Sequence, residues 1–186
     1  MESMTMQTMT AEDVLEFWFG LPDEAHFTKD AKLDAVIKSR FGDALEEAKA
    51  GGLDGWLKTP RGALAMVILL DQFSRNIHRG SAETFAGDAK ARAIADELFV
   101  SGKCSELPAD QVKWLVMPFM HSEQLADQER CVELCNEHGL DGTTSYAVHH
   151  ADIIRKFGRF PHRNGILNRQ MTPKEQEFLD QGGFTG

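Results

Sequence analysis

Two stretches of the sequence lack acidic residues and carry side chains that could hold an anion. They span residues 72–82 and 153–174, and their candidate residues are Arg75, Asn76, Arg79, Arg159, His162, Arg163 and Asn164. Guanidinium groups bind phosphate or carboxylate through two parallel hydrogen bonds, and imidazole and carboxamide groups add further donors. The stretches therefore predict a site for an anionic group. The alternative is structural, since arginine near the C-terminal end of a helix also complements the helix dipole.

Asp71 is a second candidate, because it follows directly on the apolar residues 67–70 in a segment that predicts a helix buried on several sides. An ionised carboxylate at such a position must be paired or hydrogen-bonded. Arg75 lies four residues later, which is the favourable order for an ion pair along a helix. The pair could be purely structural, or it could orient Arg75 within a site.

Two adjacent histidines, His149 and His150, lie on a predicted helix over residues 144–157. Together with Tyr146 and Ile153 they fall on the stripe that we expect to face the core. A single buried histidine bonded to a carbonyl is the usual structural case. Two neighbouring histidines followed by Asp152 also suggest a ligand-binding role.

His121, Glu123 and Asp127 form a third group. If Ser122 caps the next helix, the two acidic residues favour its positive N-terminus, which is a complete structural explanation. With His149 or His150 the group could instead bind Zn, Mn or Fe. The spacing matches no known metal-ligand signature, so we predict no metal and no cofactor.

The elements that must position these residues are all predicted to be helical, because apolar residues recur at intervals of three and four. Capping residues and glycines delimit about eight helices, at residues 10–20, 28–51, 59–78, 87–101, 108–117, 122–138, 144–157 and 172–181. Pro118 is expected to end the fifth. The short connections predict antiparallel helix pairs, stacked as a right-handed superhelix or as a compact orthogonal bundle.

The composition of the chain excludes several classes of partner. It has 186 residues and a formal net charge of -9, which argues against nucleic acid and anionic membranes as partners. We expect a disordered leader over residues 1–9 and one domain over residues 10–186. No apolar run is long enough to cross a membrane. The odd number of cysteines and the lack of a signal peptide point to the cytoplasm. The sequence makes no prediction about oligomeric state.

Four strings resemble the motifs of a bacterial family of unknown function: VLEFWFG at 14–20, LDQFSRN at 70–76, MPFMHSE at 117–123 and FGRFPHRN at 157–164. The resemblance covers the chain after the leader. It implies a tetratricopeptide-like helical fold and no established activity. It also places recurring polar positions at Asp71, Gln72, Arg75, Asn76, His121, Glu123, Asp127, Arg159, His162, Arg163 and Asn164.

These observations leave three hypotheses for function. In the first, a helical domain binds an anionic small molecule or a peptide terminus through Arg75, Arg79, Arg159 and Arg163 on its inner surface. In the second, the protein is a hydrolase of a phosphorylated or carboxylated metabolite, with Glu123 or Asp71 as general base and His121 or His162 as general acid. In the third, the motifs are structural and fasten the C-terminal loop to the helices.

Overall fold

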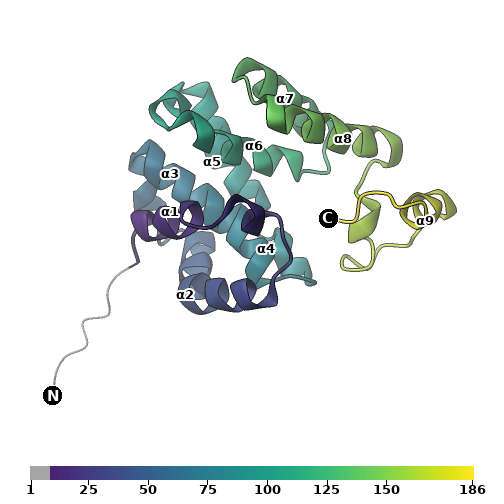
Figure 1. Ribbon diagram of the computed structural model, residues 1–186, viewed down its shortest axis with the longest axis horizontal. Helices are drawn as coiled ribbons and strands as arrows, with labels where there is room; N and C mark the ends of the chain where they lie inside the picture. Colours follow the sequence, from purple (N-terminus) through teal and green to yellow (C-terminus); the bar gives the residue numbers. More distant parts are fainter. Residues whose placement is uncertain (1–8) are drawn as a thin grey trace.

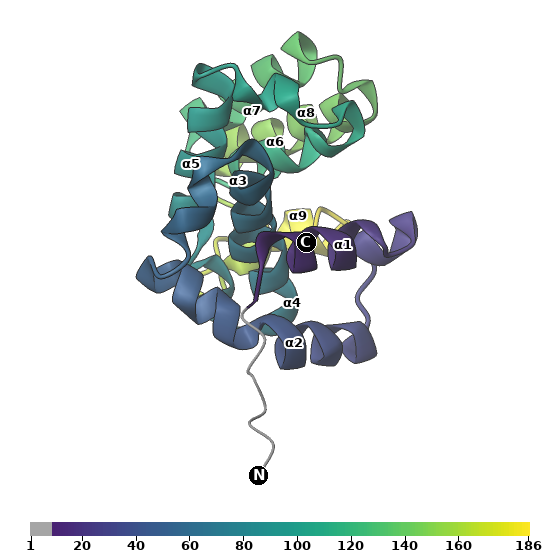
Figure 2. The same ribbon diagram turned by 90° about the vertical axis from the view of Figure 1, so that its left-hand side faces the viewer.

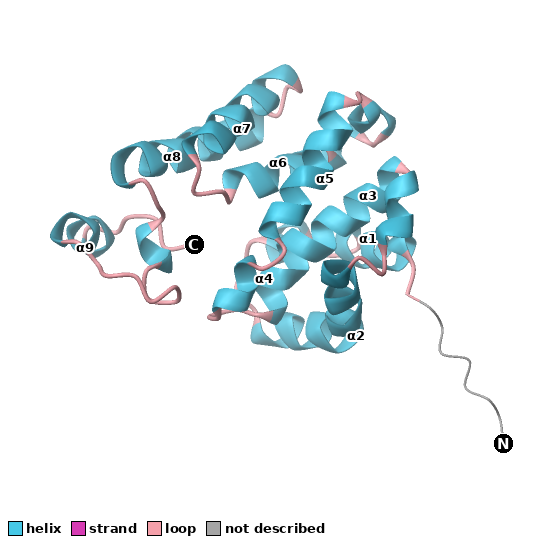
Figure 3. Cartoon of the chain, turned by 180° about the vertical axis from the view of Figure 1, so that it is seen from behind, coloured by secondary structure: helices cyan, strands magenta, loops and turns pink. Residues whose placement is uncertain are grey.

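The computed structural model describes residues 9–186, and these fold into helices without any strand (Figure 3). The all-α prediction is therefore confirmed for the described part of the chain. The expected leader falls largely on residues 1–8, which lie outside the described residues. Met9, its last residue, packs against the hydrophobic core.

The helices follow the predicted order, and the third prediction corresponds to α3 and α4 joined by a π-helical turn. Their bounds are α1 (Ala11–Phe19), α2 (Ala31–Ala50), α3 (Pro60–Val67), α4 (Ser74–Ile77), α5 (Asp88–Val100), α6 (Lys113–Met120), α7 (Leu125–Glu137), α8 (Asp141–Phe157) and α9 (Pro173–Asp180). Thr10, Thr59 and Thr172 cap α1, α3 and α9 as predicted. Each threonine oxygen accepts an otherwise unpaired amide of the first helical turn.

The structure corrects several helix boundaries. Pro118 lies inside α6, whereas Pro108 precedes a short 3-10 turn (Ala109–Gln111). A proline inside a helix removes one backbone hydrogen bond, and burial of its neighbours in the core offsets that loss. Ser122 does not cap α7, which begins at Leu125; its hydroxyl instead accepts the Gln124 amide and donates to Asp127.

The central helix, residues 60–77, comprises α3, the π-turn (Ile68–Phe73) and α4. Residues 62–71 are all buried, as the all-round apolar pattern predicts. The π-turn was not predicted, since it leaves no distinct mark on the apolar spacing. Such turns insert one extra residue into a helix and occur often at functional sites. This one contains Asp71.

Four helices, α1, α2, α5 and α6, pack around the central helix, whereas α7, α8 and α9 lie to one side of it (Figure 1). α2 packs on the π-turn and α4 (Figure 2), while α1, α5 and α6 contact α3. From α5 to α8 each helix packs on the next, and α7 and α8 form an antiparallel pair (Figure 1). After α8 the chain continues through residues 158–172 to α9. We call residues 158–186 the C-terminal segment.

Gly87 allows the start of α5 to approach the central helix closely. A Cβ atom at Gly87 would lie 2.6 Å from the carbonyl oxygen of Leu70 and 3.2 Å from the Leu70 Cβ. The backbone of Leu70 is fixed within the π-turn, so it cannot give way as a flexible side chain can. Gly42 in α2 is a matched contrast, because a Cβ atom there meets nothing within 4 Å.

We predict that Gly87→Ala lowers the free energy of unfolding by about 2 kcal/mol through overpacking. Gly42→Ala should raise it by about 0.5 to 1 kcal/mol, because alanine favours the helix and restricts the unfolded chain. Urea unfolding of both variants measures the difference. Equal effects of the two substitutions would mean that α5 does not pack on the π-turn as described.

Candidate functional site

A cleft of about 880 Å³ opens beside the central helix. Apolar side chains of its lining include Phe27, Met117, Met120, Tyr146 and Phe184, and we call this set the apolar wall. Polar side chains of its lining include Gln72, Arg75, Asn76, Arg79 and His121, and we call this set the polar wall. An apolar cleft with a few convergent polar groups is the usual form of a small-molecule site.

Asp71 and His121 form a hydrogen-bonded pair at the polar wall. The Asp71 side chain is 0% exposed, and its Oδ1 lies 2.8 Å from Nδ1 of His121. The histidine ring reaches the cleft. The other Asp71 oxygen accepts a hydrogen bond from Nε2 of Gln72 at 2.6 Å. The LDQFSRN and MPFMHSE strings thus meet at one carboxylate.

Arg75 completes the surroundings of Asp71. Its Nη1 donates to Oδ1 of Asp71 at 3.1 Å and to the Asp71 carbonyl oxygen at 2.7 Å. Burial raises the pKa of the Asp71 carboxyl, but the nearby Arg75 and His121 and the Gln72 hydrogen bond outweigh it. The net result is a pKa well below the ordinary value. Asp71 is therefore ionised and cannot serve as a general acid near neutral pH.

The arginines of the polar wall already have carboxylate partners. Arg75 holds Asp88 through two hydrogen bonds of 2.9 and 3.0 Å, and Arg79 holds Asp34 through two of 2.6 and 2.9 Å. Asn76 also donates to Asp34, at 2.8 Å. Both guanidinium groups are therefore neutralised by carboxylates of the fold itself. Neither Asp34 nor Asp88 was a sequence candidate, because an acidic residue in the first turn of a helix is common.

Arg163 differs from these arginines, because no carboxylate forms an ion pair with it among the described residues. It is 7% exposed and packs between the rings of Phe85 and Phe160, at 4.4 and 4.7 Å from their centroids. Its Nη2 donates to the His121 carbonyl oxygen at 2.8 Å, and its Nε has no partner. Burial, with the nearby charge of Arg75, lowers the pKa of Arg163 to about 10. Residues of the FGRFPHRN string therefore lie beside His121.

Of the candidate residues that do not line the cleft, four fasten parts of the chain to one another. Glu123 accepts the Phe160 amide at 2.7 Å and two hydrogen bonds from Arg169 at 2.7 and 2.9 Å. The others make ion pairs or hydrogen bonds to acidic or basic neighbours: Asp127 to Arg92, Arg159 to Glu175, and Asn164 to Glu175 and Arg169. Burial raises the pKa of Glu123, but the Arg169 and Phe160 hydrogen bonds bring it below the ordinary value.

The histidines of the C-terminal half are placed differently from one another. His150 is buried and lines the cleft, whereas His149 and Tyr146 are exposed, which corrects the expected inward stripe. His150 and His162 pack against Phe184, with ring centroids 4.6 and 5.1 Å apart. Burial lowers the pKa of each of these two histidines to about 4. Both are therefore neutral at neutral pH.

A metal centre has no geometric support within residues 9–186, because no three His, Cys, Asp or Glu side chains there are grouped to hold an ion.

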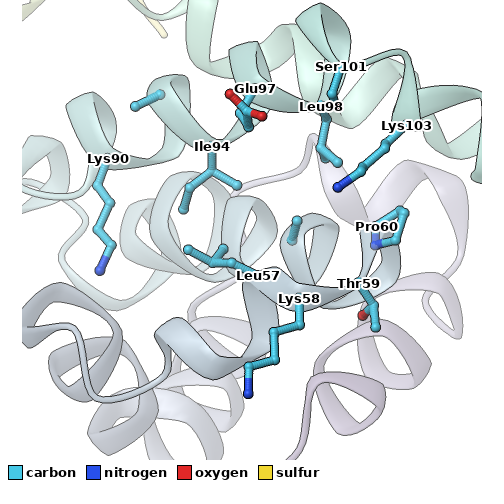
Figure 4. Close-up of a pocket in the computed structure, with 12 residues that line it drawn as sticks. Leu57, Lys58, Thr59, Pro60, Lys90, Ile94, Glu97, Leu98, Ser101 and Lys103 are labelled. Carbon is cyan, nitrogen blue, oxygen red and sulfur yellow. The ribbon is translucent and has the colours of Figure 1, made fainter.

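A second cavity of about 270 Å³ lies between α3 and α5, where Leu57 and Ile94 face each other (Figure 4). None of the candidate residues lines it. The helices of the described part include none that is long and apolar enough to cross a membrane.

The network predicts a large effect of removing Asp71. Asp71→Ala should lower the free energy of unfolding by about 3 kcal/mol, the lower end for breaking a buried pair, because Arg75 keeps Asp88 as a partner. Urea unfolding of Asp71→Ala, Arg75→Ala and the double variant should give a coupling energy of at least about 1 kcal/mol. Full additivity would show that the two side chains do not interact.

The same pair also predicts a pH dependence. The folded state lowers the Asp71 pKa. The stabilisation of the fold by ionised Asp71 is therefore complete above about pH 4 and is lost as the pH falls below this value. Asp71→Asn removes this titration. The difference in stability between wild type and Asp71→Asn should therefore narrow in acid, and a constant difference would contradict the ion pair.

Glu123 predicts a local effect on the C-terminal segment. Glu123→Ala removes the acceptor of the Phe160 amide and of Arg169. Amide exchange around Phe160 should become at least about tenfold faster, since hydrogen bonds to a charged group contribute about 1.5 to 3 kcal/mol. Glu133→Ala, on the exposed side of α7, is the matched control and should leave this exchange unchanged. Unchanged exchange in Glu123→Ala would show that Glu123 does not fasten the segment.

Comparison with known proteins agrees with this architecture. Residues 14–183 match the family model described as "Bacterial protein of unknown function (DUF924)". None of the curated proteins matches the chain. Among solved structures, the chain is similar to the protein of unknown function ATU0120 from Agrobacterium tumefaciens. The two are 41% identical with a TM-score of 0.87, over 92% of this chain and 97% of that chain. The chain therefore belongs to the bacterial family of unknown function DUF924.

Proposed function

We propose that the cleft binds a small organic molecule, or the terminus of a peptide, that has an apolar body and an anionic group. The observation that carries this proposal is the presence of both apolar and polar side chains in the lining of one cleft of about 880 Å³. The volume suits a metabolite or a few residues of peptide. The tetratricopeptide-like scaffold implied by the motifs agrees with this role, because such folds bind ligands on concave helical surfaces.

The apolar wall favours a ligand with an aromatic or aliphatic body. Phe27 and Tyr146 are 68% and 63% exposed, although large aromatic side chains are normally buried. Phe27 stacks on Trp114, with the ring centroids 5.9 Å apart and an angle of 12° between the ring planes. Trp114 itself is buried, so it holds Phe27 in place at the cleft. A flat apolar group could extend this stack.

The anionic group is favoured by basic side chains that have no carboxylate of their own. Lys29 and Lys113 line the cleft, and neither makes an ion pair with a residue of the described chain. Arg79 lies on the same lining but is bound to Asp34. Asp110 and Asp141 also line the cleft, so a ligand with a second, cationic or hydroxyl group finds acceptors there as well.

Particular contacts favour each of the two other hypotheses, a structural role of the motifs and a hydrolase. The ion pairs of Glu123 with Arg169 and of Arg159 with Glu175 favour a structural role for those residues. The Asp71–His121 pair favours the hydrolase hypothesis, in which the protein acts chemically on its ligand.

We also propose a cytoplasmic location, on the grounds of the reduced cysteines Cys104, Cys131 and Cys135, which are all buried and unpaired.

Phenyl phosphate is a suitable probe, because it combines a flat apolar group with an anion. It should raise the melting temperature saturably at constant ionic strength, since a ligand of the folded state stabilises it by RT ln(1 + [L]/Kd). Benzyl alcohol and inorganic phosphate, which each lack one half of the probe, should be weaker. Constant ionic strength and a sulfate control separate binding from nonspecific exclusion.

Lys29→Gln and Lys113→Gln should each weaken the apparent affinity for phenyl phosphate about fivefold, equivalent to about 1 kcal/mol. Lys38→Gln is the control, because Lys38 is exposed on α2 and does not line the cleft. Equal binding by all three variants and the wild type would refute an anion site in the cleft. Equal stabilisation by benzyl alcohol would leave only the apolar wall as a binding surface.

A further inference from the structure

We propose that His121 is a general base, which takes a proton from a molecule bound in the cleft through its Nε2 atom, and that Asp71 positions the ring for this role. The inference shares the cleft with the proposed function. It does not depend on the anionic group of the ligand. It assigns the protein an activity, proton abstraction, in addition to binding.

The hydrogen bond to Asp71 fixes which nitrogen of His121 carries the proton. An ionised carboxylate only accepts hydrogen bonds, so Nδ1 of His121 must be the donor across the 2.8 Å contact. In the neutral ring the free electron pair then lies on Nε2. Asp71 is fully buried and is itself held by Gln72 and Arg75, so it cannot turn away. The carboxylate therefore sets both the tautomer and the orientation of the ring.

Nε2 is available to a ligand. It makes no hydrogen bond with any described residue, and it is absent from the buried polar atoms that lack a partner. The side chain is 19% exposed, and the ring lines the cleft beside Met117 and Met120. Surroundings of this kind exclude part of the water that would compete with a ligand for the base.

The charge of Asp71 also suits a proton acceptor. When Nε2 takes up a proton, the imidazolium lies against the Asp71 carboxylate, which stabilises the added charge. The positive charges of Arg75 and Arg163, which lie close by, act in the opposite sense, while His150 is neutral. The carbonyl of His121 accepts a hydrogen bond from Arg163, and this fixes the backbone at the end of α6.

The geometry favours proton transfer and not covalent catalysis. No serine, threonine or cysteine side chain of the described residues forms a hydrogen bond with His121, so no activated nucleophile is present there. The ligand must therefore supply the acidic proton, from a hydroxyl group, a thiol group or an activated carbon, or a bound water molecule must do so.

A neutral probe tests the base without requiring the natural ligand. 5-Nitrobenzisoxazole is a flat aromatic molecule whose ring opens when a base removes the proton on C3. That proton passes to Nε2, the C–H electron pair becomes the third bond of a nitrile, and the N–O bond breaks to release a coloured phenolate. The reaction needs no oxidant and no second reactant. Its rate reports a base in an apolar site.

The wild type should open the ring saturably, and His121→Gln should lower the rate at least about tenfold. His138→Gln is the matched control, because His138 is exposed at the end of α7 and does not line the cleft. It should retain the wild-type rate. A wild-type rate no higher than that of His121→Gln, or an equal loss in His138→Gln, would overturn the proposal.

Asp71→Asn tests the positioning role, since the amide oxygen can still accept from Nδ1 but carries no charge. The rate should fall at least about fivefold, and the pH at half-maximal rate should move downward because the protonated ring has lost its counter-charge. A purely structural role would leave the pH profile in place. If this variant does not fold, nitrogen NMR of the wild-type histidines gives the answer, and a proton on Nε2 in the neutral ring would refute the assignment.

Two readouts in the wild type, phenyl phosphate binding and opening of the neutral probe, separate this inference from the proposed function. Absence of phenyl phosphate binding with an intact probe reaction would refute only the proposed anion site. An absent probe reaction with intact phenyl phosphate binding would refute only the base.

Discussion

The rest of the structure depends on one constraint, which is that the ionised carboxylate of Asp71 is buried and must have its hydrogen bonds satisfied. Its donors come from different parts of the chain: Gln72 and Arg75 from the central helix and His121 from the end of α6. Arg75 then binds Asp88 at the start of α5, and the His121 carbonyl binds Arg163 of the C-terminal segment. The three polar motifs are therefore members of one network around a single charge.

The same electrostatic rule explains why most of the basic candidates are not free. A guanidinium group inside a protein is stabilised by a carboxylate held through two hydrogen bonds, and Arg75, Arg79, Arg159 and Arg169 each have one. An acidic chain supplies these partners in abundance. Stretches without acidic residues in sequence are thus neutralised by acids from elsewhere in the fold. Arg163 is the exception, and the flanking rings of Phe85 and Phe160 take the place of a counter-ion.

Local signals made the helices predictable, whereas the network was predictable only in part. Caps such as Thr10 and Thr172 and the apolar spacing depend on neighbours within one helical turn, so the sequence contains them directly. The Asp71–Arg75 pair belongs to the same local class. The partners Asp34 and Asp88, the inclusion of Pro118 in α6 and the π-turn depend on tertiary contacts. The apolar wall of the cleft escaped prediction because Phe27 and Tyr146 resemble ordinary core residues in sequence.

Burial of Asp71 links stability to the proposed chemistry. A base is useful only if its ring is held in one tautomer and one orientation before the ligand arrives. At the surface a carboxylate could do this only weakly, because water would compete for His121 and the side chains would be mobile. In the interior, the same contacts that satisfy the carboxylate also immobilise the ring, while Nε2 makes no hydrogen bond with a described residue and His121 lines the cleft. The single hydrogen bond between Asp71 and His121 therefore satisfies the buried carboxylate and also holds the His121 ring ready for the proposed proton transfer.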